Sequence, residues 1–183
     1  MKTKNRTRFS NVILGFFFAV LTIGFSACSS SDDEMDQLTD TKDTQGTAAP
    51  DFSLTALDGS TVNLKSYENK VLVMFFFGNT CPACKAAAPS IQSKIADIYA
   101  SNKDFAIIGL DQWNGNKASV EAFKSTTGID FTLLLDASKV SSDYNTTYDR
   151  LIVVDKEGKI RFKGAQGASK DINDVLSTIN TYL

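Results

Sequence analysis

The chain has 183 residues, of which 43% are hydrophobic, with 19 basic and 21 acidic side chains and no histidine. It contains no basic cluster of the kind that neutralises phosphates, so nucleic-acid binding is excluded and no nucleic-acid partner is expected. The length fits a leader and a linker followed by one ordinary domain with its own core.

The first 27 residues have the basic, apolar and small-residue regions of a secretory signal, in that order. The apolar run at 12–25 is shorter than the roughly 20 residues that span a bilayer. Cys28 follows small residues, and this stretch is similar to the lipidated cysteine of bacterial lipoproteins. A plain cleavable signal with an incidental cysteine and an uncleaved anchor are the alternatives. We predict a signal peptide at 1–27 and a membrane anchor through lipidated Cys28.

Residues 29–47 contain six acidic side chains and only two large apolar ones, Met35 and Leu38. Such a segment buries too little apolar surface to fold, so we predict an acidic tether at 28–47 and a domain at 48–183. The stretch 31–34 resembles a surface-export signal of lipoproteins in some Gram-negative bacteria, or is an ordinary solvated linker. We therefore expect a membrane-anchored lipoprotein of a Gram-negative cell envelope, either periplasmic or surface-exposed.

The folded part begins with alternating apolar and polar residues on both sides of Asp58-Gly59, which predicts a β-hairpin over 52–64. The continuous apolar run at 71–77 indicates a strand buried on both faces. Further strands are expected at 105–110, 131–135, 151–154 and 159–162. Helices are expected at 82–100, 118–124 and 171–183. This order predicts an α/β sandwich, with helices on both faces of a mixed central sheet and an N-terminal hairpin.

The segment Cys81-Pro82-Ala83-Cys84 passes from strand 71–77 through a tight turn into the next helix. Residues three apart on a helix are separated by about 5–6 Å, which suits a disulfide. Free N–H groups and the helix dipole would stabilise a thiolate at Cys81. We expect Cys81 to attack from an exposed position and Cys84, one turn deeper and shielded, to resolve the mixed disulfide.

These motifs occur in an order that resembles one family. Segments 49–52, 71–77 and 81–85, Pro89 and the turn at 155–160 follow one another as in thioredoxin-like TlpA/ResA proteins and the related redoxin (AhpC/TSA) domains. The resemblance implies a thioredoxin-like fold that reduces or exchanges protein disulfides outside the cytoplasm. Its partners would be protein thiols or disulfides and an upstream redox donor. We expect no cofactor and a monomer.

The chain also departs from the family at three positions. Thr80 stands where many relatives have Trp, and Phe75 stands where thioredoxins keep a buried acid. Relatives carry a cis-proline before the strand at 151–154, whereas this chain has Asp149 there. We expect Tyr148, Asp149 and Arg150 to face the Cys81 sulfur, where the carboxylate would disfavour the thiolate. The predicted active-site loop comprises Thr80, Pro82, Ala83 and Asp149.

A peroxiredoxin-like thiol peroxidase is the nearest alternative. That chemistry needs a hydroxyl and an arginine that activate one thiolate. Relatives of that type have Thr three residues before the cysteine, where this chain has Gly78. Arg150 is a possible activator, or an exposed charge at the end of a strand.

In a second alternative the protein is a non-enzymatic surface lipoprotein, and the disulfide only stabilises its fold. A zinc site would need more ligands than one Cys-x-x-Cys pair supplies in a chain without histidine, so no metal is expected. Trp113, at the end of a predicted strand, either lines a ligand crevice or is partly buried under a loop.

Overall fold

The computed structural model describes residues 46–183, so the predictions for 1–45, including the signal peptide and lipidation at Cys28, lie outside the described residues. The strands are β1 (Thr47–Ala48), β2 (Ser53–Thr55), β3 (Thr61–Asn63), β4 (Val71–Phe77), β5 (Phe105–Asp111), β6 (Thr132–Leu134), β7 (Arg150–Val154) and β8 (Lys159–Lys163). The helices are α1 (Pro82–Ile91), α2 (Asp97–Tyr99), α3 (Lys117–Thr127), α4 (Ser138–Asp143) and α5 (Ala168–Tyr182). A 3-10 turn, η1 (Leu64–Tyr67), and a π-helical turn, η2 (Gln92–Ala96), complete the elements.

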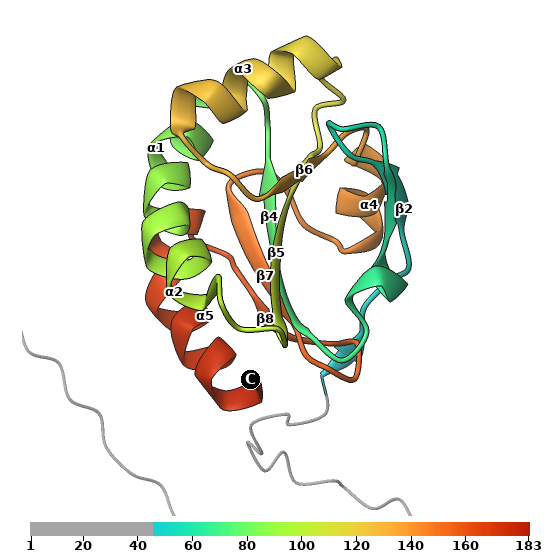
Figure 1. Cartoon of the computed structure of the whole chain (residues 1–183), viewed down its shortest axis with the longest axis vertical. Coiled ribbons are helices and arrows are strands. Elements are labelled where there is room, and N and C mark those ends of the chain that lie inside the picture. The colour runs from blue at the N-terminus through green and yellow to red at the C-terminus, as the bar shows by residue number, and fades with distance from the viewer. Residues whose placement is uncertain (1–45) are drawn as a thin grey trace, which may run out of the picture. The chain divides into compact units, whose positions relative to one another are not determined.

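Six strands form a mixed central sheet in the order β1-β8-β7-β4-β5-β6. Helices α1, α2, α3 and α5 cover one face, and α4 lies with the β2–β3 hairpin on the other (Figure 1). The predicted α/β sandwich with an N-terminal hairpin is therefore confirmed. In the part of the chain from 46 to 183, no helix combines the length and the hydropathy that crossing a membrane requires.

Strand β4 is the centre of the sheet, and all seven of its residues are buried. It runs parallel to β5 and antiparallel to β7. Its alternate side chains belong to two separate cores, because successive residues of a strand point to opposite faces. The helical face receives Val71, Val73, Phe75 and Phe77, and the hairpin face receives Leu72, Met74 and Phe76. The carboxyl end of this well-fixed strand leads into the cysteine segment.

The predicted helix after β4 is continuous but changes its hydrogen bonding along its length. Pro89 lies inside α1 and has no N–H to donate, and the helix turns from α to π at Gln92. The N–H of Gln92 bonds to the carbonyls of both Ala88 and Pro89, and the Ser93 hydroxyl donates to the Pro89 carbonyl at 2.9 Å. The irregularity that follows Pro89 is thus a π-helical turn.

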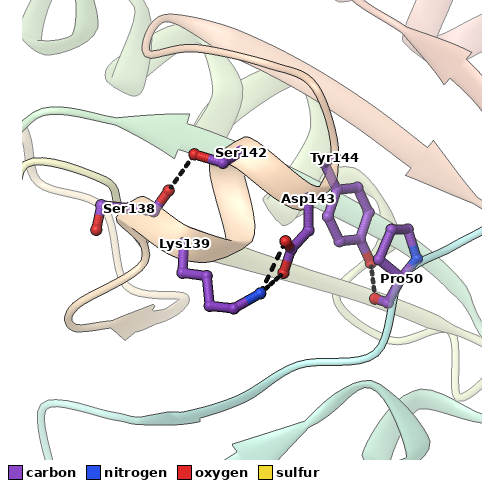
Figure 2. Close-up of polar contacts among 6 residues, drawn as sticks. All are labelled: Pro50, Ser138, Lys139, Ser142, Asp143 and Tyr144. Atoms are coloured by element: carbon purple, nitrogen blue, oxygen red, sulfur yellow. Dashed lines mark hydrogen bonds and ion pairs between the residues drawn. The ribbon is translucent and has the colours of Figure 1, made fainter.

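Helix α4 was not predicted, because Val140 is the only large apolar residue within it. Its function in the fold is visible at its end, where the buried Tyr144 hydroxyl donates a hydrogen bond of 2.8 Å to the Pro50 carbonyl (Figure 2). Burial raises the pKa of Tyr144 far above its usual value. On the solvent side, Lys139 and Asp143 form an ion pair of 2.7 Å (Figure 2). Helix α4 therefore fastens the segment that precedes β2.

The turn between β7 and β8 is organised by one buried carboxylate, that of Asp155. It accepts the N–H groups of Glu157 at 3.0 Å and Lys159 at 2.8 Å, and it pairs with the Arg161 guanidinium. Burial raises the pKa of Asp155, but the Lys159 and Arg161 hydrogen bonds outweigh it and hold the pKa below its usual value. Gly158 supplies the positive φ of 74° that the turn requires. Across this turn β7 and β8 pair antiparallel.

One edge of the sheet begins earlier than expected. Thr47 and Ala48 pair with Ile160 and Lys159 of β8. Gly46, just before them, has no space for a side chain, because a Cβ atom would overlap the Ile160 carbonyl. Thr47, assigned by the sequence to the end of the tether, is therefore part of the sheet.

Candidate redox site

Cys81 and Cys84 lie where β4 gives way to α1. The chain leaves β4 at Phe77, and the Cys81 N–H donates to the Gly78 carbonyl at 2.9 Å, which closes a tight turn. Cys81 has extended backbone angles and is the N-cap of α1, and Pro82 occupies the first helical position. Proline is suited to this position, because its missing N–H would have had no partner there.

The two cysteines form a disulfide, with their Cα atoms 5.3 Å apart. The Cys81 sulfur also accepts the N–H of Cys84 at 3.1 Å. An acceptor at the N-cap satisfies one of the free N–H groups of the first helical turn, and the positive end of the helix dipole favours negative charge there. After reduction, this environment would stabilise a thiolate at Cys81.

The prediction that Cys81 is exposed is wrong. Its relative exposure is 1% and that of Cys84 is 0%. Cys81 is covered because it belongs to the helical-face core that also contains Phe77 and Phe123. Exposure therefore does not distinguish the two sulfurs, whereas the N-cap position does. The exposed residues around the pair are Thr80, Pro82 and Ala83.

A buried carboxylate, Asp111, ties the cysteine turn to the loop after β5. It pairs in register with Phe77 and is 0% exposed. One oxygen accepts the N–H groups of Asn79 at 3.1 Å and Trp113 at 3.4 Å, and the other accepts that of Gly115 at 2.6 Å. Burial raises the pKa of Asp111, and these hydrogen bonds oppose that rise in part. The carboxylate holds two loops in a fixed relation beside the cysteines.

Sequence reasoning missed Asp111. The family comparison directed attention to Phe75, which is fully buried and carries no acid. A buried acid near the cysteines, Asp111, lies instead at the end of β5, the neighbouring strand. Its signal in the sequence was an aspartate that ends an otherwise apolar strand.

Two exposed aromatic side chains lie beside the cysteine turn. Trp113 is 43% exposed and Tyr148 is 41% exposed. Their ring centroids are 5.1 Å apart, with an angle of 70° between the ring planes. The indole ring lies against the backbone of Gly78, where any side chain would overlap it. Trp113 is thus partly buried, as one of the two interpretations of the sequence expected, and the rest of the residue is exposed beside the turn.

Asp149 has a left-handed backbone with a φ of 57°, and it contacts the start of α5. Its carbonyl accepts the Ala168 N–H at 2.9 Å, and its carboxylate lies 3.4 Å from the same nitrogen. Arg150 donates to the Asp149 carbonyl at 2.8 Å. Burial raises the pKa of Asp149, although the Ala168 hydrogen bond and Arg150 oppose this. That the Asp149 carboxylate faces Cys81 stays a prediction.

Metal binding has no assembled site in the described part of the chain. Within residues 46–183, no three His, Cys, Asp or Glu side chains are grouped so that they could hold an ion.

A mixed sheet with helices on both faces, and a Cys-x-x-Cys pair at the start of the helix after the central strand, define a thioredoxin-like redox fold. The chain belongs to the AhpC/TSA family, whose model matches residues 45–163. The family resemblance inferred from the sequence is therefore confirmed.

Individual relatives agree with this assignment. The chain is 27% identical over 118 residues to the thioredoxin-like protein YneN of Bacillus subtilis, covering 64% of this chain and 69% of that protein. It is 29% identical over 118 residues to the thiol-disulfide oxidoreductase ResA of Geobacillus kaustophilus, covering 63% and 66%. The chain thus spans about two thirds of the length of these relatives. A solved structure from Bacteroides thetaiotaomicron, described as a candidate protein disulfide isomerase, superposes with a TM-score of 0.69 at 30% identity, covering 75% of this chain and 89% of that one.

Proposed function

We propose that the chain is an exported, lipid-anchored thiol-disulfide oxidoreductase that exchanges protein disulfides through Cys81 and Cys84. The observation that carries this proposal is the disulfide at the helix N-terminus, in which the Cys81 sulfur accepts the Cys84 N–H at 3.1 Å. The family, and relatives named thiol-disulfide oxidoreductase, support the same class of reaction.

In the reducing direction, the Cys81 thiolate attacks one sulfur of a substrate disulfide. A mixed disulfide forms and the other substrate sulfur leaves as a thiolate. The Cys84 thiolate then attacks the Cys81 sulfur, which releases the second substrate thiolate and closes the internal disulfide. Two electrons have passed to the substrate, and an upstream dithiol donor restores the pair. The same steps in reverse oxidise a substrate dithiol.

Trapping of the intermediate tests this division of labour. A Cys84→Ser variant lacks the resolving thiol, so mixed disulfides should accumulate through Cys81 and be visible on a non-reducing gel and by mass spectrometry. The matched Cys81→Ser variant should accumulate none. Trapping through Cys84 instead would reverse the two roles, and equal trapping by both variants would indicate a symmetric pair.

The reduction potential distinguishes a redox-active disulfide from one that only stabilises the fold. Structural disulfides typically have potentials below about −300 mV. A value above that limit, with ready reduction by a dithiol, supports exchange, and a value below it contradicts the proposal.

Gly78 stands where a peroxidase would carry its hydroxyl and lies under the Trp113 ring, which favours disulfide exchange over peroxide reduction.

Membrane attachment is the second half of the proposal and rests on the sequence before the described residues. Lipidated Cys28 would be the first residue of the mature protein in a Gram-negative cell envelope. Two or three acyl chains would hold it durably, since one chain alone binds a membrane only marginally. Mass spectrometry of the membrane fraction should find acylated Cys28. An unmodified mature N-terminus at another residue would contradict the anchor.

A further inference from the structure

Between residues 46 and 183 few large apolar side chains are exposed, and two of these three lie together. Within residues 46–183 they are Ile98, Trp113 and Tyr148, with exposures of 61%, 43% and 41%. Ile98 lies on α2, whereas the other two are in mutual contact beside the cysteine turn. Scattered apolar residues need no explanation, but a paired patch at a reactive site indicates binding.

The aromatic pair is assembled by the two strands that flank β4. Trp113 comes two residues after the end of β5, and Tyr148 comes two residues before the start of β7. Because both strands pair with β4, these loops meet over Gly78, three residues before Cys81. The Asp111 carboxylate accepts the Trp113 N–H and fixes its loop. The sheet thus holds the two rings beside the turn that leads to Cys81.

We propose that Trp113 and Tyr148 are the docking surface for the polypeptide whose disulfide reacts at Cys81. The pair selects a segment that carries an apolar or aromatic side chain next to the reacting cysteine. This inference rests on the proposed function and names its substrate class. Rigid aromatic side chains provide much contact area at low entropic cost and are enriched at binding hot spots.

The exposed residues next to the disulfide favour an apolar segment over a charged one. A charged substrate side chain held against the two aromatic rings would lose hydration, and the rings themselves offer it no opposite charge. The exposed residues that border the cysteines are all uncharged, and they are Thr80, Pro82 and Ala83. The surface next to the cysteines is therefore uncharged at these three residues.

The test compares the rates at which the reduced protein attacks different disulfides. The substrates are a peptide disulfide with phenylalanine beside the cysteine, a matched peptide with aspartate there, and hydroxyethyl disulfide as a small uncharged reference. The measured quantity is the rate with each peptide divided by the rate with the reference. We expect the wild-type ratio to be higher for the phenylalanine peptide, and Trp113→Ala to lower that ratio about tenfold, a factor that corresponds to about 1.4 kcal/mol. Tyr148→Ala should lower it a few-fold, and the control Ile98→Ala should leave it unchanged.

Equal wild-type ratios for the two peptides, or an unchanged ratio in Trp113→Ala, would overturn the docking surface alone. A wild-type protein that does not react even with hydroxyethyl disulfide would refute the proposed function itself.

A second measurement keeps the Trp113 ring in place, because that ring also packs on Gly78. Trp113 is the only tryptophan of the chain, so its emission reports on this surface directly. Each peptide is trapped as a mixed disulfide with the Cys84→Ser variant. Emission should move to shorter wavelength with the phenylalanine peptide and not with the aspartate peptide. The same emission from both adducts would contradict the proposal.

Discussion

Removal of the Asp111 carboxylate should both destabilise the protein and loosen the cysteine turn. Hydrogen bonds to a charged group contribute about 1.5–3 kcal/mol each. Asp111 accepts two at 3.1 and 2.6 Å, from Asn79 and Gly115, and a longer one of 3.4 Å from Trp113. Part of this gain is offset by the cost of burying the charge, which alanine would relieve. We expect Asp111→Ala to lower the free energy of unfolding by about 2–4 kcal/mol.

The same group should make stability depend on pH. Burial raises the pKa of Asp111 above the ordinary value of 3.8, so the folded state binds this proton more tightly than the unfolded state does. Its stabilising contribution is then fully present below pH 3.8 and is lost as the pH rises through the folded pKa. Asp111→Asn cannot titrate. The stability of the wild type relative to this variant should therefore decline as the pH rises through that window.

Urea unfolding at a series of pH values measures both effects. The matched control is Asp174→Asn, because Asp174 is exposed on α5 and takes no part in the hydrogen bonds or the charge environment of Asp111. An Asp111→Ala variant within about 0.5 kcal/mol of the wild type would refute the view that this carboxylate holds the loops. A pH-independent difference between wild type and Asp111→Asn would refute the raised pKa.

Three further predictions concern other polar groups. Tyr144→Phe keeps the ring but loses the 2.8 Å bond to Pro50, and should cost about 0.5–1.5 kcal/mol in urea unfolding; no loss would show that this bond does not hold the segment. Although burial raises the pKa of Asp155, hydrogen bonds from N–H groups and a guanidinium lower it overall, so its stabilisation is present above pH 3.8 and is lost as the pH falls through the folded pKa. Asp155→Asn should flatten that acid transition, followed by circular dichroism, and an unchanged transition would contradict this. Asp149→Asn should shift the Cys81 thiolate titration, measured by absorbance, to lower pH, whereas an unchanged titration would show that the carboxylate faces elsewhere.

The parts of the fold that depend on local sequence pattern could be predicted from the sequence. The apolar run at 71–77 identified β4 with its correct bounds, because a strand buried on both faces has no polar alternation. Asp58-Gly59 identified the hairpin, in which an Asp58 carboxylate oxygen accepts the Ser60 N–H at 2.9 Å. The Cys81–Cys84 pair was likewise readable, since helical spacing alone brings the two Cα atoms into disulfide range.

Features that depend on contacts between distant segments could not be predicted from the sequence. Cys81 is buried because it packs with residues such as Phe123, 42 positions away along the chain. The hydrogen bond that the Asn79 N–H donates to Asp111 requires the register between β4 and β5, which no local pattern specifies. Helix α4 has too little apolar periodicity to be detected, and its stability comes from packing against the sheet.

Strand β1 bears on the behaviour of the molecule in concentrated solution. It lies at one edge of the sheet, and its two residues pair with backbone N–H and C=O groups of β8. An uncovered strand edge is a template on which a second molecule can add its own strand. A protein shortened to begin at Pro50 would present that edge of β8 to its neighbours and should self-associate. By pairing with β8, the two residues Thr47 and Ala48 thus limit the pairing of strands from different molecules.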